Sequence, residues 1–321
     1  MQYDIFNGDA DGICALHQLR LSEPIDAAVR VTGVKRDIAL LDRVEASAGD
    51  TLTVLDLGVE PNAPALGRIL QAGARVRWFD HHHPGELPVH PAFEAHIDTA
   101  AEVCTSLLVD RWLGGRFRIW AVVAAFGDNL GAAARDAAAP LGLDEDALDI
   151  LRELGECINY NGYGETLADL ILPPDVLYRT LHEYADPFAF AAESPAYARI
   201  RAGQHEDLAR AEALTPQVQS PGGAIYILPD AAWARRVSGV FANRIANASP
   251  RQAHAVLTPA RAGAYTVSVR APLARREGAD TLCRAFAGGG GRRAAAGING
   301  LPATELDTFA RAFQTAWPVP V

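Results

Sequence analysis

The chain of 321 residues is 49% hydrophobic and carries a formal net charge of −10 at pH 7, so it is long enough for two domains with sizeable cores. An acidic chain is poorly suited to non-specific binding of long duplex DNA, which requires many phosphate contacts. The sequence has no apolar run of membrane-spanning length, no basic-then-apolar leader and no Cys-x-x-Cys pair among its four cysteines, which predicts a cytoplasmic protein with reduced thiols.

A strand, an acidic loop and a helix are predicted at the start of the chain. The strand covers residues 3–6, the loop is Asn7-Gly-Asp-Ala-Asp-Gly12, and the helix covers residues 13–21. Asp9 and Asp11 lie two positions apart, so in an extended loop their carboxylates could approach metal ions from neighbouring directions. The alternative is a turn in which an aspartate caps the helix.

The next predicted elements alternate between strand and helix. Strands are expected over residues 27–33, 51–56 and 74–79, with a helix over residues 61–73 between the last two. The strand at residues 51–56 is almost entirely apolar, as buried parallel strands are, and it ends on Asp56. This alternation predicts an α/β fold with a mostly parallel sheet and right-handed crossovers.

The run Asp80-His81-His82-His83 follows the strand at residues 74–79, and Pro84-Gly85 then forces a turn. Ligands in open α/β sheets bind just outside the carboxyl ends of the strands. Carboxylate and imidazole groups are ligands of divalent metals, so the run is a candidate metal site. A solvated histidine turn is the alternative for this run taken alone.

Another carboxylate accompanies an apolar helix. Residues 93–97 lead to an acidic helix start around residues 98–106, and a buried helix over residues 119–129 carries Asp128 near its end. A charge beside so apolar a run needs a partner or a metal, unless it only caps the following turn.

Helices dominate the chain between residues 143 and 214, with a polar, aromatic turn predicted at residues 159–164. A stretch rich in proline, glycine and serine near residues 216–223 then separates helix from strand. We therefore expect three parts: a catalytic domain over residues 1–190, a helical linker over residues 191–221 and a smaller α/β domain over residues 222–321.

The C-terminal part differs from the rest in charge. Residues 222–321 hold 12 arginines and 5 acidic residues, whereas residues 1–221 hold 17 basic and 34 acidic residues. An acidic part could bind metal ions and an arginine-rich part could bind phosphate groups. The alternative is that the charge of the two domains differs by evolutionary drift alone. The predicted elements are strands at residues 224–228, 254–258 and 265–270 and helices at residues 233–246 and 303–316.

A glycine-rich stretch, Gly288-Gly-Gly-Gly-Arg-Arg-Ala-Ala-Ala-Gly297, follows these strands. The backbone N–H groups of Gly289, Gly290 and Gly291, with the fixed charges of Arg292 and Arg293, suit a phosphate or nucleotide. A flexible glycine loop is the alternative.

Carboxylates that converge on one sheet edge repel one another unless cations neutralise them, and two divalent metals would do so. The ordered motifs resemble those of the DHH phosphoesterase superfamily with its DHH-associated C-terminal domain, and in particular the RecJ-like exonucleases and the short-oligonucleotide phosphodiesterases. The motifs are Asn7-Gly-Asp-Ala-Asp-Gly12, Leu55-Asp-Leu-Gly58, Asp80-His-His82, Ala125-Phe-Gly-Asp128, Val267-Ser-Val-Arg270 and Gly290-Gly-Arg-Arg-Ala-Ala-Ala-Gly297.

The resemblance implies two divalent ions, with Mn²⁺ expected, in a cleft between the two domains. It places His82 near the scissile phosphate, with Asp80 as a second catalytic residue. The implied metal ligands are Asp9, Asp11, Asp56, His81 and Asp128, with Asp56 bridging the ions. The implied substrate-binding residues are Asn7, Arg270, Gly289, Gly290, Gly291, Arg292 and Arg293.

Two positions depart from the family pattern. The first motif commonly begins with histidine, whereas Asn7 offers only a neutral carbonyl oxygen, so one ion is expected to bind less tightly. A histidine usually follows the paired glycines, whereas Arg292 binds phosphate but cannot donate a proton at neutral pH.

The function expected from the resemblance is hydrolysis of short single-stranded oligonucleotides or a related small phosphorylated nucleotide by metal-activated water. One alternative is a phosphatase for 3′-phosphoadenosine 5′-phosphate, and another is a degenerate member that binds nucleotides or nucleic acid without turnover. An inorganic pyrophosphatase is disfavoured, because the basic signature of that group's C-terminal domain is not found. The oligomeric state is left open by the sequence, with a homodimer as one option.

Overall fold

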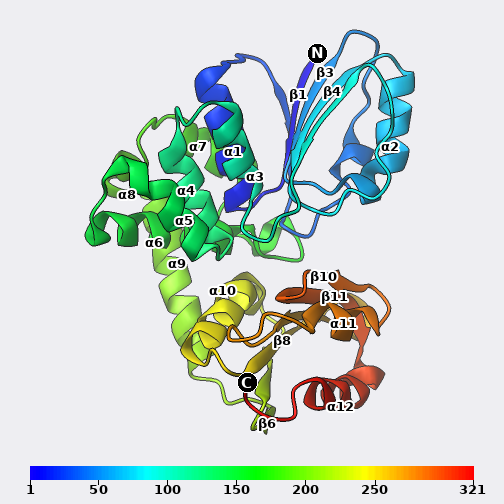
Figure 1. Cartoon of the computed structure of the whole chain (residues 1–321), viewed down its shortest axis with the longest axis vertical. Helices are drawn as coiled ribbons and strands as arrows, with labels where there is room; N and C mark the ends of the chain where they lie inside the picture. The colour runs from blue at the N-terminus through cyan, green and yellow to red at the C-terminus, as the bar shows by residue number, and fades with distance from the viewer. The chain divides into compact units, whose positions relative to one another are not determined.

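The computed structural model describes the backbone of residues 1–321 and the side chain of every residue except Arg261. It divides into two compact units, Met1–Ala202 and Gly203–Val321, and the division falls within the long helix α9 (Pro195–Glu212) (Figure 1). Each unit has its own sheet and its own hydrophobic core.

The first unit contains a parallel sheet with the strand order β2-β1-β3-β4-β5. Phe6, Leu55 and Phe79 are in register across the three central strands, so these strands end at the same edge of the sheet. The predicted α/β fold with a parallel sheet is therefore confirmed. The strands are β1 (Gln2–Phe6), β2 (Val29–Val31), β3 (Thr51–Leu55), β4 (Arg75–Asp80) and β5 (Phe93–Ile97).

Helices cover both faces of this sheet (Figure 1). Helix α2 (Val59–Gln71) packs on one face, where its apolar residues share a core with Val54 and Trp78. Helices α1 (Ala10–Ser22) and α3 (Thr105–Trp112) lie on the other face. There the Arg20 guanidinium of α1 bonds to the buried Asp4 carboxylate through Nε at 3.0 Å.

The remainder of the first unit is helical. Helix α4 packs against both α1 and α6, which places its C-terminal end beside the first acidic loop. None of the helices described in the structure is long and apolar enough to cross a membrane. The helices are α4 (Arg118–Gly127), α5 (Gly131–Ala138), α6 (Glu145–Gly162), α7 (Pro174–His182) and α8 (Pro187–Glu193), with single 3₁₀ turns at Leu40–Arg43, Ala139–Leu141 and Leu167–Asp169.

The second unit is built on a mixed sheet with the order β10-β11-β9-β8-β7-β6, in which only β7 and β8 run parallel. Helix α10 (Ala232–Ala248) packs on one face, where Phe241 meets Tyr226 edge-on. Helices α11 (Ala279–Arg284) and α12 (Leu306–Ala316) close the core on the other face. The strands are β6 (Val218–Ser220), β7 (Gly223–Ile227), β8 (Ala253–Ala260), β9 (Ala264–Arg270), β10 (Gly289–Gly291) and β11 (Ala295–Pro302).

Three local predictions are wrong. The helix expected around residues 98–106 begins only at Thr105, because its first N–H groups are capped by a carboxylate from elsewhere in the chain. The turn expected at residues 159–164 is largely the last turn of α6. The flexible glycine loop, which was the alternative for residues 288–297, is wrong because β10 pairs there with the start of β11 as an antiparallel strand.

Candidate metal centre and active site

Asp56 lies directly after β3, at the edge where the parallel strands end. Its backbone N–H donates to the Phe79 carbonyl at 3.0 Å, and its φ of 57° places it in the left-handed region that aspartate tolerates better than most residues. This turn directs a buried carboxylate to the edge of the sheet, where its Oδ1 accepts a hydrogen bond from Thr105 Oγ1 at 3.2 Å.

The first acidic loop holds its two carboxylates by means of two helix N-termini. Asp9 caps α1, and its Oδ1 accepts from the backbone N–H groups of Asp11 and Gly12 at 3.0 and 3.1 Å. Asp11 is itself in the first turn of α1, and its two carboxylate oxygens accept from the N–H groups of Thr105 and Ser106, each at 2.7 Å. Both carboxylates therefore have fixed positions before any ligand binds.

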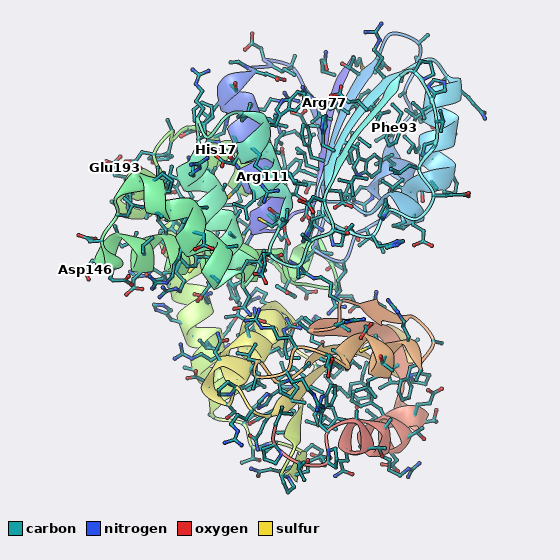
Figure 2. The ribbon with its side chains drawn as sticks, in the orientation of Figure 1. His17, Arg77, Phe93, Arg111, Asp146 and Glu193 are labelled. Carbon is teal, nitrogen blue, oxygen red and sulfur yellow. The ribbon has the colours of Figure 1, made fainter. Side chains whose placement is uncertain are left out.

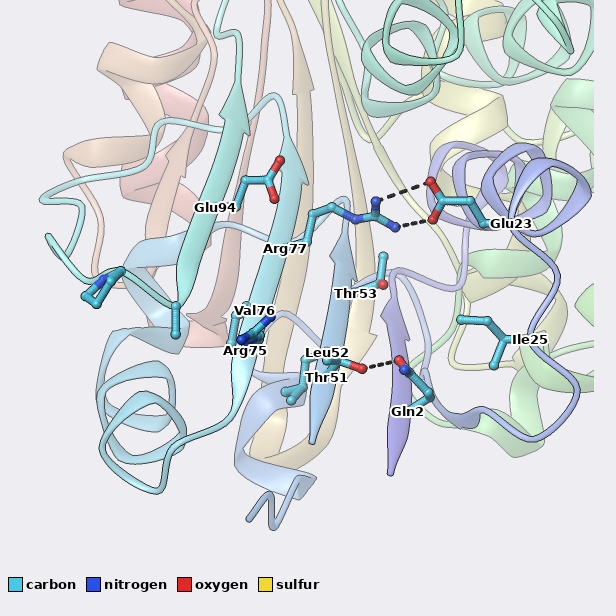
Figure 3. A pocket seen from close by; sticks show the side chains of 12 residues that line it. Gln2, Glu23, Ile25, Thr51, Leu52, Thr53, Arg75, Val76, Arg77 and Glu94 are labelled. Atoms are coloured by element: carbon cyan, nitrogen blue, oxygen red, sulfur yellow. Dashed lines mark hydrogen bonds and ion pairs between the residues drawn. The ribbon is translucent and has the colours of Figure 1, made fainter. Parts of the chain in front are cut away.

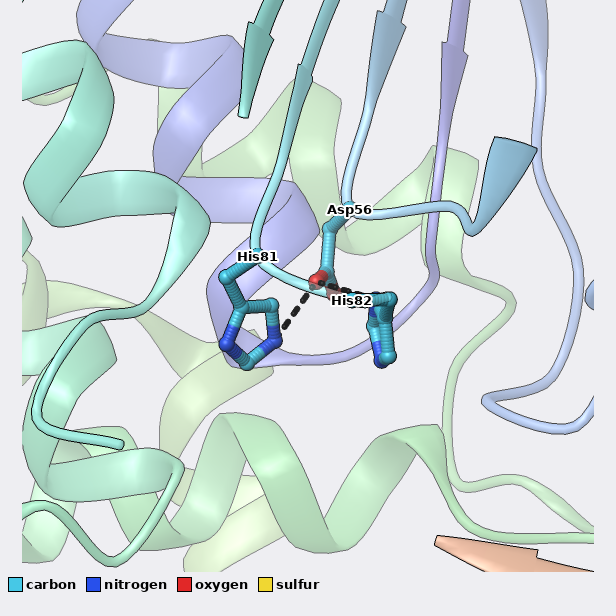
Figure 4. Close-up of side chains that lie close together, drawn as sticks. All are labelled: Asp56, His81 and His82. Carbon is cyan, nitrogen blue, oxygen red and sulfur yellow. Dashed lines mark ion pairs between the residues drawn. The ribbon is translucent and has the colours of Figure 1, made fainter. Parts of the chain in front are cut away.

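His81 presents one ring nitrogen to the Asp56 carboxylate (Figure 4). Its Nδ1 lies 2.8 Å from the Val103 carbonyl, which can only accept, so Nδ1 carries a proton and the neutral form of the ring has its lone pair on Nε2. Nε2 lies 3.4 Å from Asp56 Oδ1 and 3.9 Å from Asp11 Oδ2. A neutral imidazole oriented by a backbone carbonyl is the form that binds a metal ion.

The spacing of these atoms fits a shared divalent ion. Two ligand atoms that each lie about 2.1 Å from one ion are roughly 3.0–3.4 Å apart, for angles between octahedral and tetrahedral. The separation between His81 Nε2 and Asp56 Oδ1 falls in this range. Among the residues that the structure describes, ligand atoms of Asp56, His81 and His82 form the group that lies within 4.8 Å of one another.

His82 differs from His81 in its partner and its exposure. Its Nδ1 lies 2.7 Å from Oδ1 of the fully buried Asp80, while its side chain is 51% exposed. Burial lowers the pKa of His82, but the hydrogen bond and charge of Asp80, together with the charge of Asp56, raise it more, so the pKa ends above its usual value. His82 is thus a half-exposed imidazole beside the His81 and Asp56 pair, and Asp80 favours its protonated form.

The neighbouring carboxylates disfavour the ionised form of Asp56. Burial, and then the charges of Asp11 and Asp9, raise the pKa of Asp56 well above its usual range. A bound divalent ion would remove this cost, because it favours the ionised form of its ligands.

Lys35, which we did not predict from the sequence, lies on the other side of the first acidic loop. Its ammonium group forms an ion pair with Asp9 Oδ2 and lies 3.8 Å from Asp128 Oδ1. Burial lowers the pKa of Lys35, but nearby negative charge, that of Asp9 above all, raises it well above its usual value. One signal was present in the sequence, since this is the single lysine among 29 basic residues.

The predicted metal ligands fall into two groups in the structure. His81 Nε2 lies 3.4 Å from Asp56 Oδ1 and 3.9 Å from Asp11 Oδ2, whereas Asp9 and Asp128 both face Lys35. Asn7 is buried, and its Nδ2 donates to the Lys35 carbonyl at 3.2 Å.

The predicted phosphate-binding residues all belong to the second unit. Arg270 ends β9, and its Nε donates to Asn243 Oδ1 at 2.7 Å. A Cβ on Gly289 would lie 1.8 Å from the Cys283 carbonyl, and Gly291 has a φ of 134°, so close packing and backbone shape already require these two glycines. Gly290 has open space around its Cα, and the backbone N–H of Arg292 donates to the Ala295 carbonyl at 2.9 Å.

A separate hollow of 730 Å³ lies at the opposite ends of the parallel strands (Figure 3). It is lined by polar residues that include Thr51, Thr53 and Arg75 near the amino ends of β3 and β4. Arg77, also labelled in Figure 2, forms an ion pair there with Glu23 at 2.7 Å. The hollow contains none of the predicted site residues.

No protein-family model and no curated protein sequence matches the chain. Among solved structures, RecJ from Thermus thermophilus in complex with Mn²⁺ matches with a TM-score of 0.67 and 20% identity, over 100% of this chain and 53% of that chain. An exonuclease RecJ bound to manganese matches with a TM-score of 0.60 and 20% identity, over 98% and 89% of the two chains. A pGpG-specific phosphodiesterase, PggH from Vibrio cholerae, matches with a TM-score of 0.52 and 16% identity, over 98% of each chain.

These matches define the fold. The chain has the two-part α/β fold of the RecJ exonucleases, and it spans about half the length of the Thermus thermophilus protein. The fold that the ordered motifs implied is therefore confirmed.

Proposed function

We propose that the chain is a divalent-metal-dependent phosphoesterase of the DHH superfamily that hydrolyses short oligonucleotides or a related small phosphorylated nucleotide. The observation that carries this proposal is the position of His81 Nε2 at the carboxyl edge of the parallel sheet, 3.4 Å from Asp56 Oδ1 and 3.9 Å from Asp11 Oδ2. This donor set suits Mn²⁺, which binds imidazole and carboxylate ligands. Two of the matching RecJ structures contain manganese, which supports the choice of ion.

A divalent ion held by Asp56, His81 and Asp11 would supply Lewis acidity toward the phosphoryl oxygen and a bound water of lowered pKa. His82 would contact the phosphate and donate a proton from Nε2, because Asp80 already holds its Nδ1. Asp80, fully buried, would keep the imidazole of His82 oriented and favour its protonated form.

Residues 222–321 would supply the substrate-binding part, with residues 1–190 as the metal-binding part and residues 191–221 as the connection. Arg270 at the end of β9, and Arg292 and Arg293 after β10, would bind phosphate oxygens bidentately. The PggH match supports a substrate as small as a dinucleotide, because that phosphodiesterase is specific for pGpG.

A second candidate is a nucleotide-binding protein without turnover. The observation that favours it is the ion pair of Lys35 with Asp9, which engages one of the predicted metal ligands. The intact arrangement of Asp56 and His81 favours the enzyme, since a binding protein has no need of an oriented metal-ligating imidazole.

The test compares hydrolysis of a labelled dinucleotide, a 24-mer and 3′-phosphoadenosine 5′-phosphate, each with Mn²⁺ and with EDTA. Rapid, EDTA-sensitive loss of the dinucleotide is the expected result. Preferential cleavage of the 24-mer would indicate a RecJ-like exonuclease, and exclusive loss of the third substrate would indicate a phosphatase. Binding of all three without hydrolysis in any metal would contradict the proposal and favour the binding protein.

A further inference from the structure

Lys35 is anchored between the two segments that build the acidic site. Its backbone N–H donates to the Gly162 carbonyl at the end of α6 at 2.8 Å, and its own carbonyl accepts from Asn7 Nδ2 at 3.2 Å. The backbone of Lys35 is therefore tied both to the first motif and to the C-terminal end of α6. A chain that uses arginine at 28 of its 29 basic positions has lysine at this one.

The ammonium group of Lys35 is surrounded by oxygen atoms in the manner of a bound cation. It pairs with Asp9 Oδ2, lies 3.2 Å from Asn159 Oδ1 and lies 3.8 Å from Asp128 Oδ1. Its three N–H bonds provide donors for three such partners. The Tyr163 ring, 5.5 Å from Nζ, flanks the group.

The partners of Lys35 are carboxylates that would otherwise be left for a second metal ion. Asp9 is 2% exposed, so its charge needs a compensating cation. A divalent ion placed among these oxygens would repel the ammonium with twice the force of a single charge at the same distance. The lysine and an ion therefore exclude each other from this position.

We propose that the Lys35 ammonium takes the place of a second divalent ion, so that the chain binds one metal ion, at Asp11, Asp56 and His81. This inference rests on the proposed metal-dependent function for the first ion. It also accounts for Asn7, where the family pattern has histidine. A second ion would need a strong ligand there, whereas the amide of Asn7 supports the backbone of the lysine that replaces the ion.

The experiment counts Mn²⁺ ions per chain. The metal-stripped full chain is dialysed to equilibrium against rising Mn²⁺, bound metal is measured by mass spectrometry, and the Mn²⁺ EPR spectrum is recorded at saturation. We expect one ion per chain in the wild type and in Lys35→Arg, which keeps the charge. Two ions per wild-type chain, with the exchange-coupled spectrum of a close manganese pair, would overturn the inference.

Two variants sharpen the test. The double variant Asn7→His with Lys35→Ala restores a ligand and removes the cation, so it should bind a second ion and give the coupled spectrum; a count that stays at one would contradict the inference. Asp9→Asn in the wild-type background should leave the single ion bound, and loss of an ion in this variant would contradict the inference. This variant keeps the inference testable if the double variant fails to fold.

Asp56→Asn is the matched control and should bind no ion. The count separates this inference from the proposed function, since it does not depend on turnover. One ion without hydrolysis of any substrate would contradict the function alone, whereas hydrolysis with two ions in the wild type would contradict the inference alone.

Discussion

Replacing Asp56 with asparagine isolates the contribution of metal binding to stability. Asparagine tolerates the left-handed backbone at this position, where φ is 57°, and its carbonyl oxygen can still accept the hydrogen bond from Thr105 Oγ1. The substitution removes one buried negative charge and the central metal ligand. We therefore expect the metal-free variant to be at least as stable as the metal-free wild type, and to show no response to Mn²⁺.

The size of the wild-type response follows from linkage. A ligand that binds only the folded state stabilises it by about 2.7 kcal/mol at a concentration 100 times its Kd. For a unit of the size of Met1–Ala202, each kcal/mol raises Tm by about 2–4 °C. Mn²⁺ at that excess should therefore raise Tm of the wild type by about 5–11 °C, because one site is filled only in the folded state.

Differential scanning calorimetry of the metal-stripped proteins, with and without Mn²⁺, measures this response. Asp42→Asn, at an exposed position outside the site, is the control and should respond to Mn²⁺ as the wild type does. An equal Mn²⁺-induced rise in Tm in Asp56→Asn and the wild type, or no rise in the wild type, would contradict metal binding at Asp56.

Three further changes test other parts of the structure. His82→Gln should keep the Mn²⁺-induced rise in Tm but lower kcat by about 10²-fold or more, since it removes a proton donor; an unchanged kcat in steady-state assays would exclude that role. Asp4→Ala leaves the buried Arg20 guanidinium unpaired and should cost about 3–5 kcal/mol in urea unfolding, so a loss below about 1 kcal/mol would contradict the buried pair. Burial lowers the pKa of His254 to about 4, whereas in the unfolded chain it is about 6.5. Between these two pKa values the unfolded state binds more protons than the folded state, so acidification from pH 7 to pH 4 should lower the free energy of unfolding of the wild type by up to about 3 kcal/mol. Calorimetry at pH 4 and 7 should show a smaller loss in His254→Leu. An identical loss in both proteins would contradict this assignment.

The position of Asp56 and Asp80 could be predicted because it depends on local pattern. Asp56 directly follows β3 and Asp80 is the last residue of β4. Parallel strands in register end at one edge of the sheet, so these two residues meet there. His81 follows Asp80 directly, and the same reasoning places it at that edge.

Features that depend on partners distant in the chain were not predictable in this way. The start of α3 at Thr105 is set by the Asp11 carboxylate, 94 positions earlier, which supplies the cap that the local sequence lacks. Lys35 follows a three-residue strand in a loop without a recognisable motif. Its role depends on the positions of Asp9 and Asp128, which folding brings close to its ammonium group.

The glycine-rich stretch was predicted to bind phosphate, with a flexible loop as the alternative. In the structure, the close approach of neighbouring backbone and a positive φ are further reasons for glycine at Gly289 and Gly291. Sequence alone does not distinguish glycine that serves a ligand from glycine that serves packing.

The most direct measurement is the rate of hydrolysis of a labelled dinucleotide by metal-stripped protein as Mn²⁺ is added back, with Asp56→Asn alongside. We predict no hydrolysis before addition, recovery that follows occupancy of the Asp56 and His81 site, and no hydrolysis in the variant at any Mn²⁺ concentration. Hydrolysis at an equal rate in EDTA, or in Asp56→Asn, would contradict the claim that this chain is a phosphoesterase whose metal is held at Asp56.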